Sequence, residues 1–362
     1  MLASRKKISI RQAVIIFLMV VYSPAIRLFP VLSSEIGERA GWLTPVFAVL
    51  PFIGLVYIMH EMFKKEKEAS LSDIFIKVLG NIPGRVLLSI YLIWLMILLG
   101  TYVRYFSERF LTLLLPNNPM PFFTITILLL VFYAVRGGIV SLTRTAEFFF
   151  LLFSILFVIL FILTLANVEI INLFPVTYYD ILPLVKSTYS ILGIWGYFTF
   201  IFFIGDKIND KEHIKRFGLQ AAVYLLLVTI MLLVQTIGVY GHTVIQRISM
   251  PYFVVIQSIS IMESLERIES VTLTFWVIVD FVIISVFMYI IIRIIKQLFS
   301  LSSSKQFMSP VTMFAYVFSF YVSRNNFELS NFSKYIALQV NIALGFVLPF
   351  IVFVIGKIRK KI

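Results

Sequence analysis

Cysteine is absent from the 362 residues, and histidine occurs only three times, at His60, His213 and His242. The sequence therefore allows no disulfide, no cysteine-ligated metal and no thiol nucleophile, and the histidines lack the spacing of metal ligands. A phosphate-binding P-loop is also missing, and no serine has the histidine and acid partners of a hydrolase. We therefore expect a protein that is not an enzyme and needs no metal or cofactor.

Charged residues are scarce as well, at 14%, while 60% of the residues are hydrophobic and the mean hydropathy is +0.99. Soluble domains carry about a quarter charged residues. The net charge of +13 does not indicate a nucleic-acid partner, because the basic residues form short clusters between apolar runs. This composition predicts an all-α integral membrane protein whose solvent is the lipid bilayer.

Apolar segments long enough to cross a membrane recur along the whole chain, since a span needs roughly 20 such residues. The first, after the basic Met1 to Lys7, is too long for a signal peptide and is expected to be retained. We expect one membrane domain over residues 1–362 with about ten spans. The expected spans cover 9–32, 42–63, 86–114, 121–140, 143–166, 183–205, 217–239, 271–297, 309–324 and 335–356.

The basic residues give this topology an orientation. With the N-terminus in the cytoplasm, every inner segment carries at least two of them, from Arg5, Lys6 and Lys7 at the start to Lys360 and Lys361 at the end. Such enrichment marks cytoplasmic segments. An odd number of spans would place the basic C-terminus outside, so we expect both termini to be cytoplasmic.

Two loops carry signals of structure. Ser70 and Asp73 have the spacing of a capping box, which predicts a short surface helix over 74–79 that ends at Gly80. The segment from Tyr252 to Glu269 is amphipathic and predicts an outer helix before the eighth span.

Spans one and six contain helix-breaking residues near the middle of the membrane. Span one has Tyr-Ser-Pro-Ala at 22–25, about 21 Å from its inner end, and span six has Gly-Ile-Trp-Gly-Tyr at 193–197. Peptide groups freed at such breaks are tolerated only inside protein or beside a polar cavity, where they bind ligands. Breaks five spans apart favour a leucine-transporter-like five-plus-five inverted repeat, about 9–166 and 183–356. The alternative is a proline kink and glycines that serve tight helix packing.

Ionisable residues within the spans add candidates. Asp280 lies about 14 Å deep in span eight, and a carboxylate there is a functional candidate or a hydrogen-bonded packing residue. Arg104 and Glu108 are four residues apart in span three and can pair as an outer gate or as a structural ion pair. Arg109, Arg27 and Glu147 are similar cases.

The chain resembles the B subunit of Ger-type spore germinant receptors, a branch of the amino acid/polyamine/organocation permease superfamily. The resemblance extends over essentially the whole chain and depends on the order and spacing of several short patterns. These are Glu35 with Ala40-Gly41-Trp42, residues 106–121 with Glu108 and Leu115-Pro116, Arg136-Gly137-Gly138-Ile139 with Arg144, Phe174-Pro175-Val176, Glu266-Arg267-Ile268-Glu269 and Ser309-Pro310-Val311.

The resemblance implies a subunit that binds a small germinant such as an amino acid and acts with an A subunit and a lipoprotein C subunit. It implies a location in the spore inner membrane or cell membrane. Many members have a glycine-rich break in span one, where this chain has Ser-Pro-Ala. The family's pocket, at the breaks of spans one and six with help from spans three and eight, corresponds here to Tyr22, Ser23, Pro24, Ala25, Ile26, Tyr102, Tyr105, Gly193, Ile194, Trp195, Gly196, Tyr197 and Asp280.

Two other functions stay open from the sequence. A permease of this architecture would move an amino acid or related solute by alternating access. No lysine in span five offers a substitute for a coupling sodium ion, so no coupling residue is assigned. A scaffolding membrane protein with a degenerate pocket is the third alternative.

Overall fold

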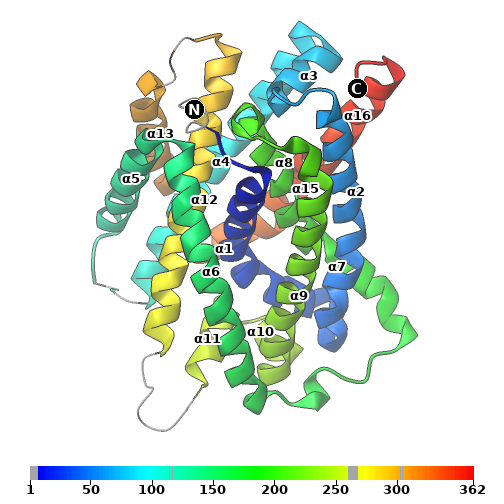
Figure 1. The fold of residues 1–362 in the computed structure, drawn as a ribbon. Coiled ribbons are helices and arrows are strands. Elements are labelled where there is room, and N and C mark those ends of the chain that lie inside the picture. Colours follow the sequence, from blue (N-terminus) through cyan, green and yellow to red (C-terminus); the bar gives the residue numbers. More distant parts are fainter. Residues whose placement is uncertain (1–6, 114, 116, 260–267, 302, 304) are drawn as a thin grey trace.

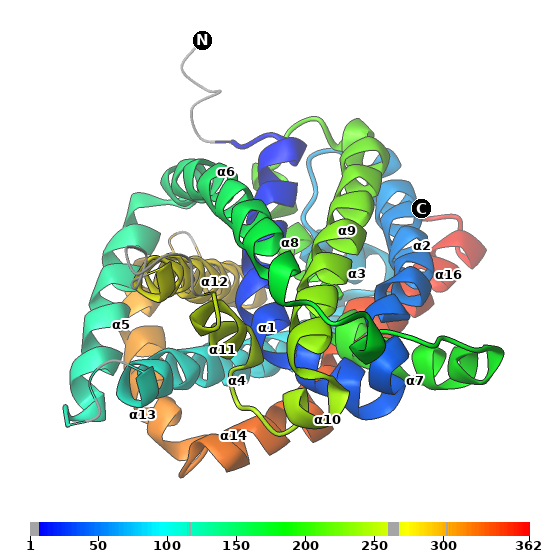
Figure 2. The same cartoon turned by 90° about the horizontal axis from the view of Figure 1, so that it is seen from below.

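The computed structural model describes residues 7–113, 115, 117–259, 268–301, 303 and 305–362, all of them helical or in short connections apart from one β-bridge. Helix α1 runs through the centre of the bundle and the others surround it (Figures 1 and 2). The long helices are α1 (Ile10–Gly37), α2 (Thr44–Lys64), α4 (Asn81–Leu113), α5 (Met120–Gly137), α6 (Ile139–Thr164), α7 (Ile181–Trp195), α9 (Ile214–Tyr240), α12 (Ile268–Leu298), α13 (Met308–Tyr321) and α16 (Leu348–Ile358).

Shorter elements join these helices or extend them. The short α-helices are α3 (Leu71–Leu79), α8 (Tyr197–Ile201), α10 (His242–Ile245), α11 (Pro251–Gln257), α14 (Asn326–Phe332) and α15 (Leu338–Ile342). The 3₁₀ turns are η2 (Glu38–Leu43), η3 (Leu165–Asn167), η4 (Ile170–Asn172), η5 (Tyr178–Asp180), η6 (Phe202–Lys207), η7 (Lys211–His213) and η9 (Lys305–Phe307). Two π-helical turns, η10 (Ser333–Ala337) and η11 (Ala343–Val347), separate the parts of the last span.

A helix stands at each of the ten predicted spans. Eight stretches of the described chain are long and apolar enough to cross a membrane, and the first of them, Ile10–Lys64, contains both α1 and α2. The ninth predicted span is α13, which has only 14 residues. The multi-pass architecture expected from the apolar runs is therefore present.

Both termini lie at one end of the bundle, which we call the terminal end (Figure 1). The predicted surface helix α3 lies there too. Its N-cap Ser70 and Asp73 form the expected capping box, and Gly80 ends the helix with φ 104°, a conformation that favours glycine. Of the predicted outer helix over 252–269, α11 forms the first part and ends at Gln257, and residues 260–267 lie outside the described residues.

The structure corrects the expected break in span one. Helix α1 is continuous from Ile10 to Gly37, with Pro24 and Pro30 inside it. A proline removes one backbone donor, but the neighbouring turns keep their own hydrogen bonds. Almost every residue of α1 is also buried against other helices. Packing on all sides therefore holds the helix in one piece.

Span six is interrupted, as the glycines predict. Helix α7 ends at Trp195, α8 begins at Tyr197, and the chain changes to 3₁₀ geometry from Phe202. The glycines also permit close packing on the last span. A Cβ added to Gly345 would lie 2.7 Å from the Cα of Gly196, and one added to Gly193 would lie 2.9 Å from the Cα of Leu338. These glycines therefore both interrupt span six and allow tight helix packing, which was the alternative explanation.

We predict that Gly345→Ala destabilises the bundle, because its methyl group can be accommodated only by moving the backbone of span six. Overpacking of this kind costs about 1–3 kcal/mol. Thermal unfolding of the purified protein in detergent measures the effect. Gly54→Ala is the matched control, since a Cβ at that position in α2 meets nothing within 4 Å. Equal melting temperatures for the two variants would show that the contact is not tight.

Candidate functional site

A closed ring of polar side chains joins three helices in the middle of the bundle. The Ser23 hydroxyl of α1 donates to Asp280 Oδ1 of α12 at 2.5 Å, and Trp276 Nε1, one turn earlier in α12, donates to Ser23 Oγ at 3.2 Å. Arg109 Nη1 of α4 donates to Asp280 Oδ2. The Arg109 guanidinium also lies 3.8 Å from the centre of the Trp276 ring. Asp280 is therefore bound from α1 and α4 at once.

The ion pair between Arg109 and Asp280 is almost fully buried, with side chains 3% and 2% exposed. Removing two charges from water is unfavourable, and their mutual attraction offsets this only when hydrogen bonds also satisfy the remaining atoms. Here Ser23 donates the second hydrogen bond to the carboxylate and is itself held by Trp276, while Arg109 Nε has no hydrogen-bond partner in the described chain. The pair fixes α4 and α12 against α1.

A second polar group links span three to spans six and ten. The hydroxyl groups of Tyr102 (α4) and Tyr197 (α8) are 2.8 Å apart, and Asn341 Nδ2 (α15) donates to Tyr197 at 3.1 Å. Trp94 Nε1 donates to Asn341 Oδ1 at 2.8 Å. Asn341 lies between the two π-helical turns, so the irregular part of the last span is held by side chains of spans three and six.

Carbonyl groups of the last span accept further hydrogen bonds. The Tyr91 hydroxyl donates to the Leu344 carbonyl at 2.5 Å, and Thr199 donates to the Gly345 carbonyl at 2.6 Å. Tyr105 donates to the Leu329 carbonyl at 2.9 Å. π-Helical turns disturb the regular helical ladder and recur at functional sites. The polar side chains of α4 and α8 satisfy this part of the backbone.

A small cavity lies between these groups and Arg27 of α1. It measures about 10 Å³, close to the smallest volume that holds one water molecule. Two more cavities, of about 10 and 20 Å³, adjoin Ile26 on the other sides of α1. The polar cavity is lined by Arg27, Leu28, Leu98, Thr101, Tyr102, Tyr105, Ile194, Tyr197, Ser333, Ala337, Leu338 and Asn341.

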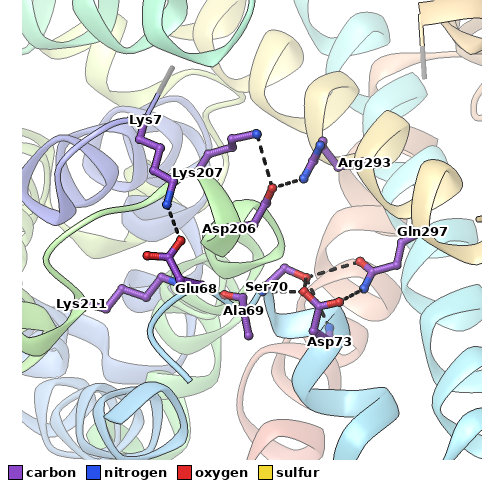
Figure 3. A network of polar contacts seen from close by, with 10 residues as sticks. All are labelled: Lys7, Glu68, Ala69, Ser70, Asp73, Asp206, Lys207, Lys211, Arg293 and Gln297. Carbon is purple, nitrogen blue, oxygen red and sulfur yellow. Dashed lines mark hydrogen bonds and ion pairs between the residues drawn. The ribbon is translucent and has the colours of Figure 1, made fainter. Parts of the chain in front are cut away.

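A network of polar contacts closes the terminal end (Figure 3). Ile8, just before α1, forms a β-bridge with Ile208 after η6. Asp206 accepts hydrogen bonds from Arg293 near the end of α12. Lys7 pairs with Glu68 in the loop after α2, and this contact holds the pKa of the Glu68 carboxyl below its usual range. Spans one, two, six and eight are thereby tied together.

At the end of the bundle opposite the terminal end, contacts from α4 and α1 hold the α14–η10 segment in place. Arg104 forms an ion pair with Glu108 at 2.6 Å and also donates to the Arg324 carbonyl at 3.2 Å. Lys334 of η10 pairs with Glu35 near the end of α1 at 2.5 Å. The polar groups around Ser23 and Asp280 and around Tyr102 and Tyr197, together called the polar centre, therefore lie between sets of contacts at the two ends of the bundle.

The structure brings some of the predicted residues together and separates others. Ser23, Tyr102, Tyr105, Tyr197 and Asp280 belong to the polar groups just described, and Ile194 lines their cavity. Pro24 is buried within α1, and three other predicted residues make contacts outside these polar groups. Tyr22 contacts Tyr224 of α9, Trp195 packs against Phe52 of α2, and Ala25 lines the cavity toward α9.

Comparison with known proteins gives the family. The spore germination protein family matches residues 7–327. The chain belongs to this family. Its members are permease-like, which confirms the expectation that the protein is not an enzyme and is a multi-pass membrane protein.

Three relatives from Bacillus subtilis (strain 168) show how far the similarity extends. Spore germination protein KB is 21% identical over 365 residues, covering 99% of this chain and 96% of that protein. Spore germination protein A2 is 22% identical over 336 residues, 91% of this chain and 90% of that protein. YfkT, provisionally named a spore germination protein, is 25% identical over 328 residues, with 91% and 90% covered.

Solved structures confirm the leucine-transporter-like fold. MhsT in complex with L-phenylalanine superposes with a TM-score of 0.71 at 10% identity, covering 97% of this chain and 89% of that one. Mhp1, a nucleobase-cation-symport-1 family transporter in a closed conformation with bromovinylhydantoin bound, gives a TM-score of 0.66 at 10% identity, with 96% and 78% covered. At this identity the likeness shows the fold alone.

Several residues of the centre were not among the predicted ligand-binding residues. Trp276 and Asn341 carry no signal that separates them from other polar groups in apolar spans. Arg27 and Arg109 stand out as arginines within spans, but the sequence does not tell which of them has a carboxylate partner. That distinction depends on contacts between residues far apart in the chain.

We predict that Asp280→Asn lowers the free energy of unfolding by about 3–5 kcal/mol, because Arg109 would keep a buried charge without its partner. The double variant Arg109→Met/Asp280→Leu should recover much of the loss, since it removes both charges of the pair. Chemical or thermal unfolding in detergent measures both. Glu61→Gln breaks an exposed pair with Lys357 and should cost under about 1 kcal/mol. A double variant as unstable as Asp280→Asn would contradict the role given to the pair.

We also predict that Asp206→Asn loosens the terminal end, because Arg293 and Lys207 both lose their carboxylate. The native chain lacks cysteine, so a single cysteine at the buried Ala13 of α1 reports access without background. Maleimide labelling in nanodiscs should become several-fold faster with Asp206→Asn. Asp210→Asn, an exposed neighbour, should leave the rate unchanged. An unchanged rate in both variants would mean that the network does not hold this end closed.

Proposed function

We propose that this protein is the germinant-sensing subunit of a spore nutrient receptor and binds a small polar ligand, of the amino acid class, between spans one, three, six and eight. The observation that carries the proposal is the enclosed polar centre. There α1, α4, α8 and α12 contribute Ser23, Tyr102, Tyr197 and Asp280 within an otherwise apolar bundle. Polar groups that converge at mid-span are costly in lipid and mark ligand or ion sites.

A conformational change is required for binding, because the cavity holds about one water molecule. A ligand that binds an expanded centre more tightly than the closed one shifts the population toward the expanded state. The contacts at both ends would then change together. We propose that partner subunits, an A subunit and a lipoprotein C subunit, respond to this change in the spore inner membrane, with both termini of this subunit in the cytoplasm.

A permease that works by alternating access is the second candidate. The fold favours it, since Mhp1, which shares this fold, is a transporter. The two functions differ in whether ligand crosses the membrane. Binding, closure of the site and a conformational response are common to both.

We predict that deleting the gene abolishes germination toward one class of nutrient while leaving other responses intact, and that a plasmid copy restores it. Loss of refractility of spores in a nutrient panel provides the measurement. Purified protein in proteoliposomes should take up none of the labelled nutrient that triggers the response. Net uptake would establish the permease instead, and a deletion strain that germinates normally with every nutrient would contradict a receptor role.

A further inference from the structure

Arg27 is a buried cation that forms no ion pair with an acid of the described residues. Its side chain leaves α1 one turn beyond Ser23, and the residue is 8% exposed. The guanidinium lies over the ring of Tyr105, 3.1 Å from its centre. Nε and Nη1 are both buried and have no hydrogen-bond partner in the described chain. The other buried arginines of the centre differ, because Arg109 has Asp280 and Arg104 has Glu108.

The charges of the centre consequently do not balance. Arg27 and Arg109 contribute two positive charges and Asp280 one negative charge, while Arg104 and Glu108 neutralise one another. A buried charge that lacks a counter-ion is strongly unfavourable, and a contact with an aromatic ring returns only a small part of this. Within the described part of the chain, one negative charge is missing beside Arg27.

The cavity beside Arg27 offers a further hydrogen-bond donor. Asn341 donates to the Tyr197 hydroxyl, and the hydroxyls of Tyr197 and Tyr102 share one hydrogen bond. Two phenols have two protons, and their mutual bond uses one of them. The other proton has no acceptor in the described chain, whichever tyrosine carries it. Both tyrosines line the cavity with Arg27. A forked cation and a free hydroxyl donor facing one small space match the two oxygens of a carboxylate.

We propose that Arg27 binds the carboxylate of the ligand, with the Tyr102–Tyr197 pair donating the accompanying hydrogen bond. The proposal rests on the proposed function and assigns the residues of this chain that bind the carboxylate of such a ligand. In the closed structure Arg27 stays on the Tyr105 ring. A ligand carboxylate supplies the missing charge and draws the guanidinium from the ring toward the cavity.

The binding test uses the purified full-length protein in detergent. Its thermal unfolding is followed with the common L-amino acids, with the amide of each acid that stabilises it, and with sugars and nucleosides. We expect at least one acid to raise the melting temperature and its amide to have no effect. Arg27→Gln should weaken binding of that acid about tenfold or more, as loss of a charged hydrogen bond does. Arg27→Lys should bind the acid with an affinity between those of the native protein and Arg27→Gln. The control Arg136→Gln, at an exposed position, should bind like the native protein.

A second readout does not need a ligand. Burying the neutral amide of glutamine costs less than burying an uncompensated charge, so ligand-free Arg27→Gln should melt at or above the temperature of the native protein. Arg109→Gln should melt lower, because Asp280 loses its partner. A lower melting temperature for ligand-free Arg27→Gln would show that Arg27 is a structural residue and would overturn the proposal.

The outcomes separate this inference from the proposed function. If an acid and its amide stabilise the protein equally, or if only sugars or nucleosides do, the subunit binds a ligand but Arg27 does not select a carboxylate. If no compound of any class binds, the proposed function fails with it. Native affinity of Arg27→Gln for a stabilising acid also overturns the assignment.

Discussion

The arrangement of this protein depends on pairing a carboxylate with a guanidinium where water is excluded. Asp280 lies in the middle of the bundle with Arg109 and Ser23 as its partners, and Trp276 in turn donates to Ser23. These residues come from three helices, so the pair also determines how α4 and α12 lie against α1. Lipid gives such groups no alternative partner, which makes the pairing stricter than in a soluble protein.

The same constraint explains the other polar contacts of the centre. The carbonyl groups of Leu344 and Gly345 lie in a π-helical turn and receive hydrogen bonds from Tyr91 and Thr199. Close approach of spans six and ten is possible because Gly196 and Gly345 have no side chains. The irregular segments are therefore well packed and hydrogen-bonded, with little empty volume between them. Under the proposed function, ligand binding at this place has to exchange existing contacts for new ones, as a switch between two conformations requires.

The sequence predicts the fold well, because its signals are local or compositional. Apolar runs give the spans, Ser70 and Asp73 give α3, and the glycines at 193 and 196 give the interruption of span six. The predicted break at Pro24 is wrong. A proline removes only one hydrogen bond, and the burial of α1 keeps its remaining turns helical. The site is predicted only in part. Asp280 is identifiable as a carboxylate inside a span, but its partner Arg109 is 171 residues away in sequence. That Arg27 has no acid or hydrogen-bond partner among the described residues follows only from the assembled bundle.

The most direct measurement is a cryo-electron microscopy structure of the subunit with a nutrient that triggers germination. Our account predicts ligand density between α1, α4, α8 and α12, in contact with the Tyr102–Tyr197 pair, and an expanded cavity around it. Ligand density elsewhere on the protein, with this centre packed as it is here, would contradict the account.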